Sequence, residues 1–142
     1  MNQVVIITGA TSGYGLATAK KFKESGDIVI AVSRNAQKVD AVVKEYGFAE
    51  GFTMDVKDYE AWKALKEFVI GKYKRVDVLV NNAGGGVKIA DVEEQSKETI
   101  DETIALNLNS VIYSANVFAP ILKEQKSGTV VNIASVCATH CC

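Results

Sequence analysis

The stretch VVIITGATSGYG, residues 4–15, determines how the rest of the chain is interpreted. It opens with a short β-branched apolar run, Val4 to Ile7, which is typical of a strand buried on both faces. Three closely spaced glycines follow, and the apolar spacing of residues 16–24 is that of a helix. The sequence therefore predicts a strand, a glycine loop and a helix in direct succession.

The glycines of this loop each have a mechanical role. Gly9 permits a tight turn, Gly13 lets the backbone approach a pyrophosphate closely, and Gly15 allows the helix to pack on the strand. The helix dipole and its N-terminal amides then attract phosphate charge. A glycine-rich turn without a ligand is the alternative, but the strand before and the helix after favour a dinucleotide loop. The candidate cofactor-binding residues in the loop are Gly9, Thr11, Ser12, Gly13, Tyr14 and Gly15.

Apolar runs and helical patterns alternate through the rest of the chain. Strands are expected at 28–32, 51–54, 76–80 and from Val130 onward after Gly128, and helices lie between them. This order, with short connections and right-handed crossovers, predicts an α/β protein with a Rossmann-type open parallel sheet. We expect strand order 3-2-1-4-5, helices on both faces, and a single dinucleotide-binding domain over residues 1–142.

The longest helical pattern runs over residues 96–125 and carries an apolar side that includes Ile100, Ile104 and Leu108. The last strand has no outer neighbour in the sequence, so Val131 and Ile133 should be exposed together with part of this helix. We therefore expect the chain to associate, as a homo-oligomer through the helix 96–125.

The end of the second strand reads AVSRN, residues 31–35. An acidic residue at this place accepts a hydrogen bond from the ribose 2′-hydroxyl of NAD, whereas Ser33 and Arg34 are suited to a 2′-phosphate. NADP is therefore favoured over NAD. Arg34 as a solvated loop residue is the alternative, and no second basic residue lies in the glycine loop to reinforce the preference.

Composition excludes several other classes. The formal net charge is −1, with 16 basic and 17 acidic residues, so we expect no nucleic-acid or membrane partner. The N-terminus has no basic region of a signal peptide, and no apolar run approaches the ~20 residues of a membrane span, which favours a cytoplasmic protein.

All three cysteines lie in the last six residues, as Cys137, Cys141 and Cys142. Together with His140 they form the pattern C-x-x-H-C-C, whose adjacent residues cannot easily ligate one tetrahedral ion. We expect no metal site and a frayed, oxidation-prone end.

Two motifs at a characteristic separation, TGATSGYG at 8–15 and NNAG at 81–84, resemble those of the short-chain dehydrogenase/reductase family. The resemblance covers the whole chain but only the front part of a family member. It implies that Asp55 and Val56 contact the adenine, and that Asn82, Ala83 and Gly84 line the cofactor. It also implies catalytic roles for Asn107, which supports a proton-relay water, and Ser135, which orients the substrate oxygen. Both asparagines have a structural alternative as bridges from loop to helix, and Ser135 as a helix cap.

The family's acid/base pair, Tyr-x-x-x-Lys on the helix after the serine, has no counterpart beyond Ser135. One such spacing occurs at Tyr59 and Lys63, but it lies on the helix after the third strand, on the adenine side of the sheet. We interpret this pair as a chance match and a solvated helix start.

The sequence leaves three functional hypotheses. The first is an oxidoreductase that transfers hydride between NADP(H) and a small carbonyl or alcohol, in a truncated form that is inactive as printed because the acid/base pair is absent. The second is a catalytically silent dinucleotide-binding module that acts as a partner or regulator. The third is a redox or metal protein that uses its cysteine tail.

Overall fold

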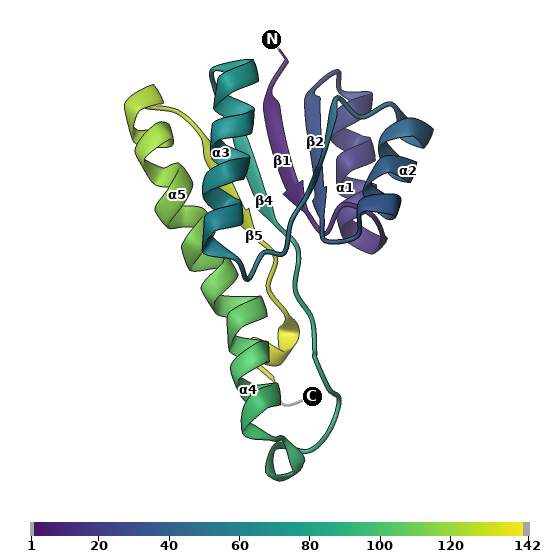
Figure 1. Cartoon of the computed structure of the whole chain (residues 1–142), viewed down its shortest axis with the longest axis vertical. Coiled ribbons are helices and arrows are strands. Elements are labelled where there is room, and N and C mark those ends of the chain that lie inside the picture. The colour runs from purple at the N-terminus through teal and green to yellow at the C-terminus, as the bar shows by residue number, and fades with distance from the viewer. Residues whose placement is uncertain (1, 141–142) are drawn as a thin grey trace.

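The computed structural model describes residues 2–140, which form a parallel sheet covered by helices (Figure 1). Five strands pair in the order β3-β2-β1-β4-β5, as the sequence predicts. The strands are β1 Val4–Thr8, β2 Ile28–Ser33, β3 Glu50–Thr53, β4 Val78–Asn81 and β5 Thr129–Asn132. The helices are α1 Gly13–Glu24, α2 Ala36–Tyr46, α3 Tyr59–Tyr73, α4 Lys97–Ile104 and α5 Ser110–Gln125, with 3-10 turns at Val92–Glu94 and Val136–Ala138.

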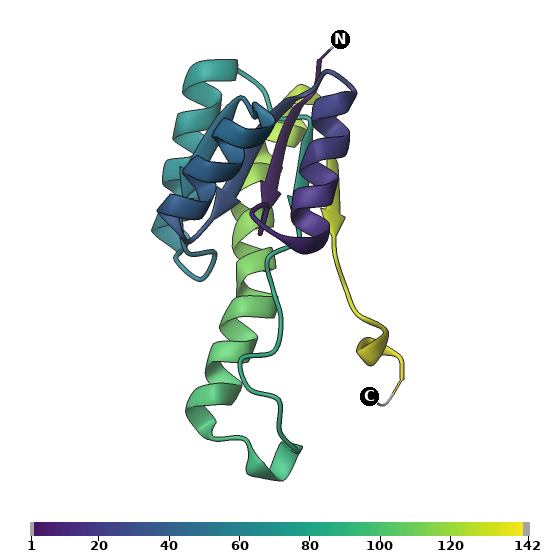
Figure 2. The same ribbon diagram turned by 90° about the vertical axis from the view of Figure 1, so that its right-hand side faces the viewer.

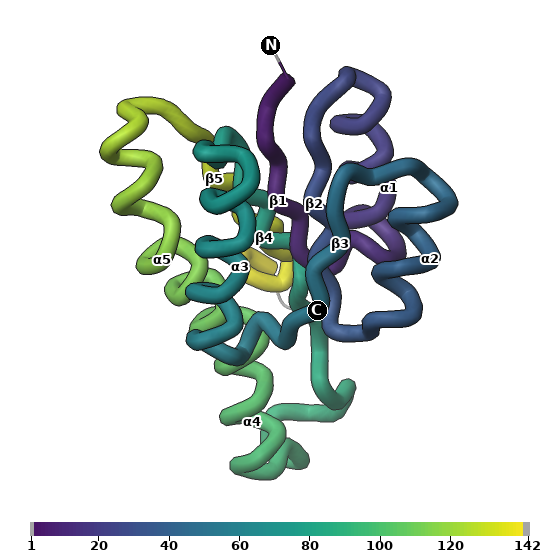
Figure 3. The backbone as a smooth tube through the Cα atoms, turned by 45° about the horizontal axis from the view of Figure 1, so that its top comes forward, coloured from purple at the N-terminus to yellow at the C-terminus, as the bar shows by residue number. Residues whose placement is uncertain are grey.

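Alternate residues of the central strands build two separate apolar layers. Val5 and Ile7 face α1 and α2, whereas Val4 and Ile6 face α3 and α5. The tube in Figure 3 shows the two pairs of helices on opposite sides of the sheet. Burying each aliphatic side chain of this kind contributes roughly 1.5–3 kcal/mol, so the two-sided pattern in the sequence accounts for the layered fold.

Trp62 anchors the larger layer. Its ring meets Phe118 of α5 edge-on at a centroid distance of 6.4 Å, and its Nε1 donates to the carbonyl of Val56 at 2.9 Å. Both rings are fully buried. This contact fixes α3 and α5 side by side and holds the loop after β3 against the start of α3.

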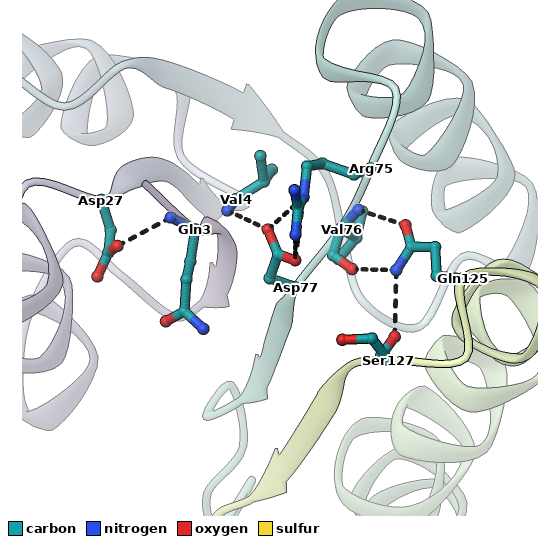
Figure 4. A network of polar contacts seen from close by, with 8 residues as sticks. All are labelled: Gln3, Val4, Asp27, Arg75, Val76, Asp77, Gln125 and Ser127. Atoms are coloured by element: carbon teal, nitrogen blue, oxygen red, sulfur yellow. Dashed lines mark hydrogen bonds and ion pairs between the residues drawn. The ribbon is translucent and has the colours of Figure 1, made fainter. Parts of the chain in front are cut away.

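A polar network closes the edge of the sheet where the strands begin (Figure 4). The buried carboxylate of Asp77 accepts from the backbone amide of Val4 at 2.8 Å and pairs with the Arg75 guanidinium. Gln125, at the end of α5, both accepts from and donates to the backbone of Val76. These residues account for a shorter fourth strand than expected: the strand begins at Val78, because the residues before it join this network.

Residues 97–125 form one long helix that contains a π-helical segment at Ala105–Asn109. Figure 2 shows that its first half and the segment after β5 both extend past the sheet. The apolar face was expected to be exposed, and Ile100, Ile104, Leu108 and Ile112 are indeed each about half exposed.

This helix corrects one expectation about membranes. Within residues 2–140 it is the one helix long and apolar enough to span a bilayer by length and composition. The stretch from Thr103 to Leu122 carries no charge, but asparagines and serines interrupt it, so the sequence shows no unbroken apolar run there. The finding is weak evidence for a membrane span, since a core helix of a soluble protein can have the same composition, and Val117 and Phe118 do pack into the core.

Candidate functional site

The carboxyl ends of four parallel strands meet at one edge of the sheet. The register pairs Ile7 with Val80 and Ser33 with Thr53, which aligns the ends of β1, β2, β3 and β4. Ligands of open α/β sheets bind at such an edge, where the strand order reverses. Here the reversal lies between β1 and β4.

The glycine loop follows β1 at this edge. Gly9 and Gly13 have φ angles of +66° and +54°, values that side chains rarely adopt, and a Cβ on Gly13 would have no atom within 4 Å. Gly15 is buried, and a Cβ there would lie 2.1 Å from the carbonyl oxygen of Gly9. Ser12 begins α1 without a side-chain capping bond, so its hydroxyl does not occupy the amides of the first turn. The loop has the shape and the donors of an anion cradle.

Asn82 fastens this loop to the end of β4. Its Nδ2 donates to the carbonyl oxygens of Thr8 at 3.1 Å and Gly9 at 3.4 Å. In return, the hydroxyl of Thr8 accepts from the amides of Asn82 and Ala83 at 3.1 and 3.0 Å. The side chain therefore bridges two loops through the backbone, which is the structural alternative considered for this asparagine.

A hollow of about 400 Å³ lies beside these loops, within the range of small-molecule sites. Nine of the predicted cofactor-binding residues line it: Gly9, Thr11, Ser12, Ser33, Arg34, Asp55, Val56, Ala83 and Gly84. Sequence reasoning missed four more lining residues: Asn35, Lys38, Met54 and Leu106.

Lys38 matters most among the missed residues, because it adds a second cation beside Arg34. It lies in the first turn of α2, where its backbone amide donates to Asn35 Oδ1 at 3.0 Å. On the opposite side of the β2 end, the Thr11 hydroxyl donates to the Ser33 hydroxyl at 3.3 Å. The signal in the sequence was the position of Lys38 one turn into the helix that follows Arg34, which brings both cations to the same edge.

Tyr14 does not share this hollow. Its side chain is 85% exposed and lines a second hollow of about 380 Å³ on the surface of α1 with Lys21 and Phe22. Gly13, Gly15 and Asn82 also do not line the first hollow, although Gly15 and Asn82 pack against Gly9, which does. The backbone of the predicted loop is thus brought to one place, but the tyrosine side chain points elsewhere.

Asn107 is held within the π-helical segment. Its Oδ1 accepts from the Gly85 amide at 2.8 Å, and its Nδ2 donates to the carbonyls of Gly85 and Thr103 at 2.8 and 3.0 Å. A Cβ on Gly84 would lie 2.8 Å from Asn107 Oδ1, so this approach needs a glycine there. The amide is fully used in binding backbone, while π-helical segments commonly mark functional positions.

Ser135 lies beyond the end of β5, which stops at Asn132 rather than continuing to the serine as expected. The serine is exposed, and its hydroxyl accepts from the amide of Cys137 at 3.2 Å, which caps a short 3-10 turn. Neither Ser135 nor Asn107 lines the 400 Å³ hollow. The structure therefore does not bring the two predicted catalytic side chains into the pocket that gathers the cofactor-binding residues.

The Tyr59 and Lys63 pair lies at the start of α3, as expected, but the tyrosine is more than a solvated helix start. Its hydroxyl donates to Asn116 Oδ1 at 2.7 Å and its ring meets Tyr113 edge-on. Lys63 forms an ion pair with Glu60. Tyr59 thus joins α3 to α5, a role that its spacing from Lys63 does not reveal.

The cysteine tail is described only in part. His140 Nδ1 lies 2.8 Å from the hydroxyl of Thr139, and Cys141 and Cys142 lie outside the described residues. Within residues 2–140, no group of three His, Cys, Asp or Glu side chains is arranged to hold a metal ion.

Comparisons with known proteins point in one direction. The profile of the short chain dehydrogenase family matches residues 3–141. The chain is 36% identical over 138 residues to a 3-oxoacyl-[acyl-carrier-protein] reductase, FabG, from Thermotoga maritima, covering 94% of this chain and 56% of that protein.

Two solved structures that are similar in fold were determined with NADPH or NADP. A variant of actinorhodin polyketide ketoreductase with NADPH has a TM-score of 0.91 at 33% identity, over 99% of this chain and 56% of that one. A metagenomic short-chain oxidoreductase in complex with NADP has a TM-score of 0.88 at 33% identity, over 94% of this chain and 62% of that one. The chain spans about half the length of the curated relatives it matches.

Proposed function

The chain belongs to the short-chain dehydrogenase family, and on that premise we propose that it is the cofactor-binding half of an NADP(H)-dependent oxidoreductase. The complete reaction would transfer hydride between NADP(H) and a small carbonyl or alcohol substrate. The observation that carries the proposal is the 400 Å³ hollow, where the glycine loop, the β2 end and the NNAG segment converge. The relatives named above are oxidoreductases, which favours this activity over a catalytically silent module.

The residues present fit such a cofactor. A diphosphate would rest on the amides at the start of α1, in the open space beside Gly13, where an added Cβ would have no atom within 4 Å. The adenine would lie against the apolar side chains of Val56 and Met54, with the Asp55 carboxylate as a hydrogen-bond acceptor. When bound, NADP(H) supplies or accepts the hydride, and the protein residues bind and orient it.

The preference for NADP over NAD rests on charge at the β2 end. Arg34 and Lys38 both line the hollow, and the hydroxyl of Ser33, the last residue of β2, accepts from the Thr11 hydroxyl of the glycine loop. Two cations and a hydroxyl suit a 2′-phosphate, whereas an acidic residue would suit a free 2′-hydroxyl. Two structural relatives that were solved with NADPH or NADP support the same preference.

Hydride transfer to a carbonyl also needs a proton donor. Asn107 and Ser135 are the catalytic residues that the family resemblance implies, yet residues 136–142 contain neither a tyrosine nor a lysine. We expect the 142-residue chain by itself to turn over substrate about two to four orders of magnitude more slowly than a chain with a general acid. In a longer protein, residues beyond 142 would supply that group.

Parallel measurements of NADPH binding and of turnover test whether this chain binds the cofactor but lacks the proton donor. The purified 142-residue chain is titrated with NADPH, and NADPH oxidation is followed with a panel of ketones and aldehydes. Saturable binding with no oxidation above the buffer rate is expected. Rapid NADPH oxidation by this chain would contradict the proposal that it lacks a general acid. A folded chain that does not bind NADPH would contradict the cofactor assignment.

The long helix of residues 97–125 carries an exposed apolar stripe, which supports association with a second copy. Ile100, Ile104, Leu108 and Ile112 recur every four residues, and each is about half exposed. A continuous apolar face of this kind is typical of an interface between subunits. A cytoplasmic location stays a prediction.

A further inference from the structure

Lys57 lies in the loop between β3 and α3, directly after three residues of the hollow. Its backbone amide donates to Asp55 Oδ1 at 2.9 Å, and its Nζ lies 3.8 Å from Asp55 Oδ2. The same ammonium donates to Glu102 Oε1 of α4 at 3.0 Å. The side chain is 25% exposed, so it is largely packed between the loop and the helix.

These contacts join two walls of the hollow that are far apart in the sequence. One wall is the loop with Met54, Asp55 and Val56, and the other is Leu106 in the π-helical segment. Glu102 lies four residues before Leu106, on the same side of the helix. The bond from Lys57 to Glu102 therefore links the adenine-side loop to the helix that faces it.

Charge gives Lys57 a second role. A carboxylate at the mouth of a phosphate-binding hollow repels an anionic ligand unless a cation balances it. The hydrogen bond to Glu102 and then the charge of Asp55 raise the pKa of Lys57, whereas burial and the Arg34 guanidinium act in the opposite direction. The ammonium thus stays charged at neutral pH and offsets Asp55.

We propose that Lys57 is a positioning residue for the cofactor: it fixes the Asp55 carboxylate toward the adenine and holds the loop against α4. The assignment rests on the proposed function of the hollow. It concerns the adenine, which NAD and NADP share, so Lys57 should act on both cofactors alike. Arg34 and Lys38, in contrast, should separate the two.

The test measures dissociation constants of NADPH and NADH for the 142-residue chain and its variants. Lys57→Met should weaken both cofactors about fivefold and leave their ratio unchanged. Lys57→Arg should restore affinity to within about twofold, because a guanidinium can reach both carboxylates. Glu102→Gln should weaken both cofactors about twofold. The matched control is Lys63→Met. Lys63 Nζ lies 2.8 Å from Glu60 Oε2, and neither residue lines the hollow, so this variant should change neither dissociation constant.

A purely structural lysine gives a different pattern. In that case Lys57→Met and Glu102→Gln would lower the melting temperature but leave the dissociation constants of the folded protein unchanged, which would overturn the assignment. An arginine variant no better than the methionine variant would do the same. If Lys57→Met does not fold, Glu102→Gln decides the matter, because wild-type affinity for both cofactors would contradict the bridge. Absence of cofactor binding by the unaltered chain would instead overturn the proposed function itself.

Discussion

A Cβ atom on Gly15 would lie 2.1 Å from the carbonyl oxygen of Gly9, so the start of α1 packs on the glycine loop at a distance that no side chain permits. The atom in the way belongs to the backbone and cannot rotate aside. The contact holds the first turn of the helix over the carboxyl end of β1. Cofactor binding should therefore depend on this one pair of glycines.

Gly15→Ala tests that dependence. We expect the substitution to destabilise the protein by about 2 kcal/mol through overpacking and to weaken NADPH binding at least tenfold, because the loop must move. Gly71→Ala is the control: Gly71 lies within α3, nothing lies within 4 Å of its added Cβ, and alanine there should stabilise the helix by roughly 0.5–1 kcal/mol. Wild-type melting temperature and affinity in Gly15→Ala would show that the loop is not held as described.

Asn82 should matter through its backbone contacts. Asn82→Ala removes the donor to the Thr8 and Gly9 carbonyls, and we expect a loss of about 1–2 kcal/mol of stability in urea unfolding, with weaker NADPH binding. Asn82→Asp keeps the size but places an acceptor against two carbonyl oxygens, so it should be at least as damaging. An aspartate variant as stable as the wild type would refute the bridging role.

The cofactor preference should respond to the two cations of the β2 end. Arg34→Ala and Lys38→Met should each lower NADPH affinity by about fivefold to tenfold and leave NADH affinity nearly unchanged. Isothermal titration with both cofactors measures the ratio. Lys44→Met, in the last turn of the same helix, should leave the ratio at its wild-type value. Unchanged discrimination in both test variants would remove the basis for assigning NADP.

Asp77 predicts a pH dependence of stability at the opposite edge of the sheet. Burial opposes ionisation of this carboxyl, but the Arg75 guanidinium and the Val4 amide outweigh it and lower the pKa of Asp77 below its ordinary value. Because the pKa is lower in the folded state, the ionised carboxylate stabilises the fold fully above the unfolded-state pKa. This stabilisation is lost as the pH falls through the folded-state pKa.

Asp77→Asn should therefore lower the free energy of unfolding by about 1–2 kcal/mol at pH 7. The difference should shrink below about pH 4, because the wild type loses the same charge there. Urea unfolding at a series of pH values measures the difference. NADPH affinity should stay constant, because the network lies at the far edge from the hollow. A stability difference that widens in acid would contradict the sign of this effect.

Association through the long helix should be sensitive to charge on its exposed stripe. Ile104→Glu should shift the chain toward monomer in sedimentation velocity, because a buried carboxylate would lie in the apolar contact. Ile89→Glu places the same charge on a fully exposed loop residue away from the helix and should leave the sedimentation pattern unchanged. A monomeric wild type at high concentration would contradict the proposed interface.

The sequence predicted the parts of this protein that local chemistry specifies. Runs such as Val4 to Ile7 predict strands buried on both faces, and the glycines after them predict the loop and its edge of the sheet. The strand order followed from the crossover rules and is confirmed. Element ends were less accurate, as at Val78, because tertiary contacts of the preceding residues decide them.

Contacts between residues far apart in the chain could not be predicted from the sequence. Lys57 and Glu102 are 45 residues apart, and nothing local distinguishes either from a solvated charge. The orientation of the Tyr14 side chain likewise depends on how α1 packs. The π-helical segment had a weak signal, since Ile100, Ile104, Leu108 and Ile112 recur at intervals of four, longer than the 3.6 residues of an α-helical turn.

The most direct test of the central claim is a titration of the folded 142-residue chain with NADPH, followed by the change in nicotinamide fluorescence. We predict saturable binding at one site per chain, weakened at least tenfold in Gly15→Ala and retained in Gly71→Ala. No binding of NADPH or NADH by a chain with native circular dichroism and cooperative unfolding would contradict the claim that this hollow holds a nicotinamide dinucleotide.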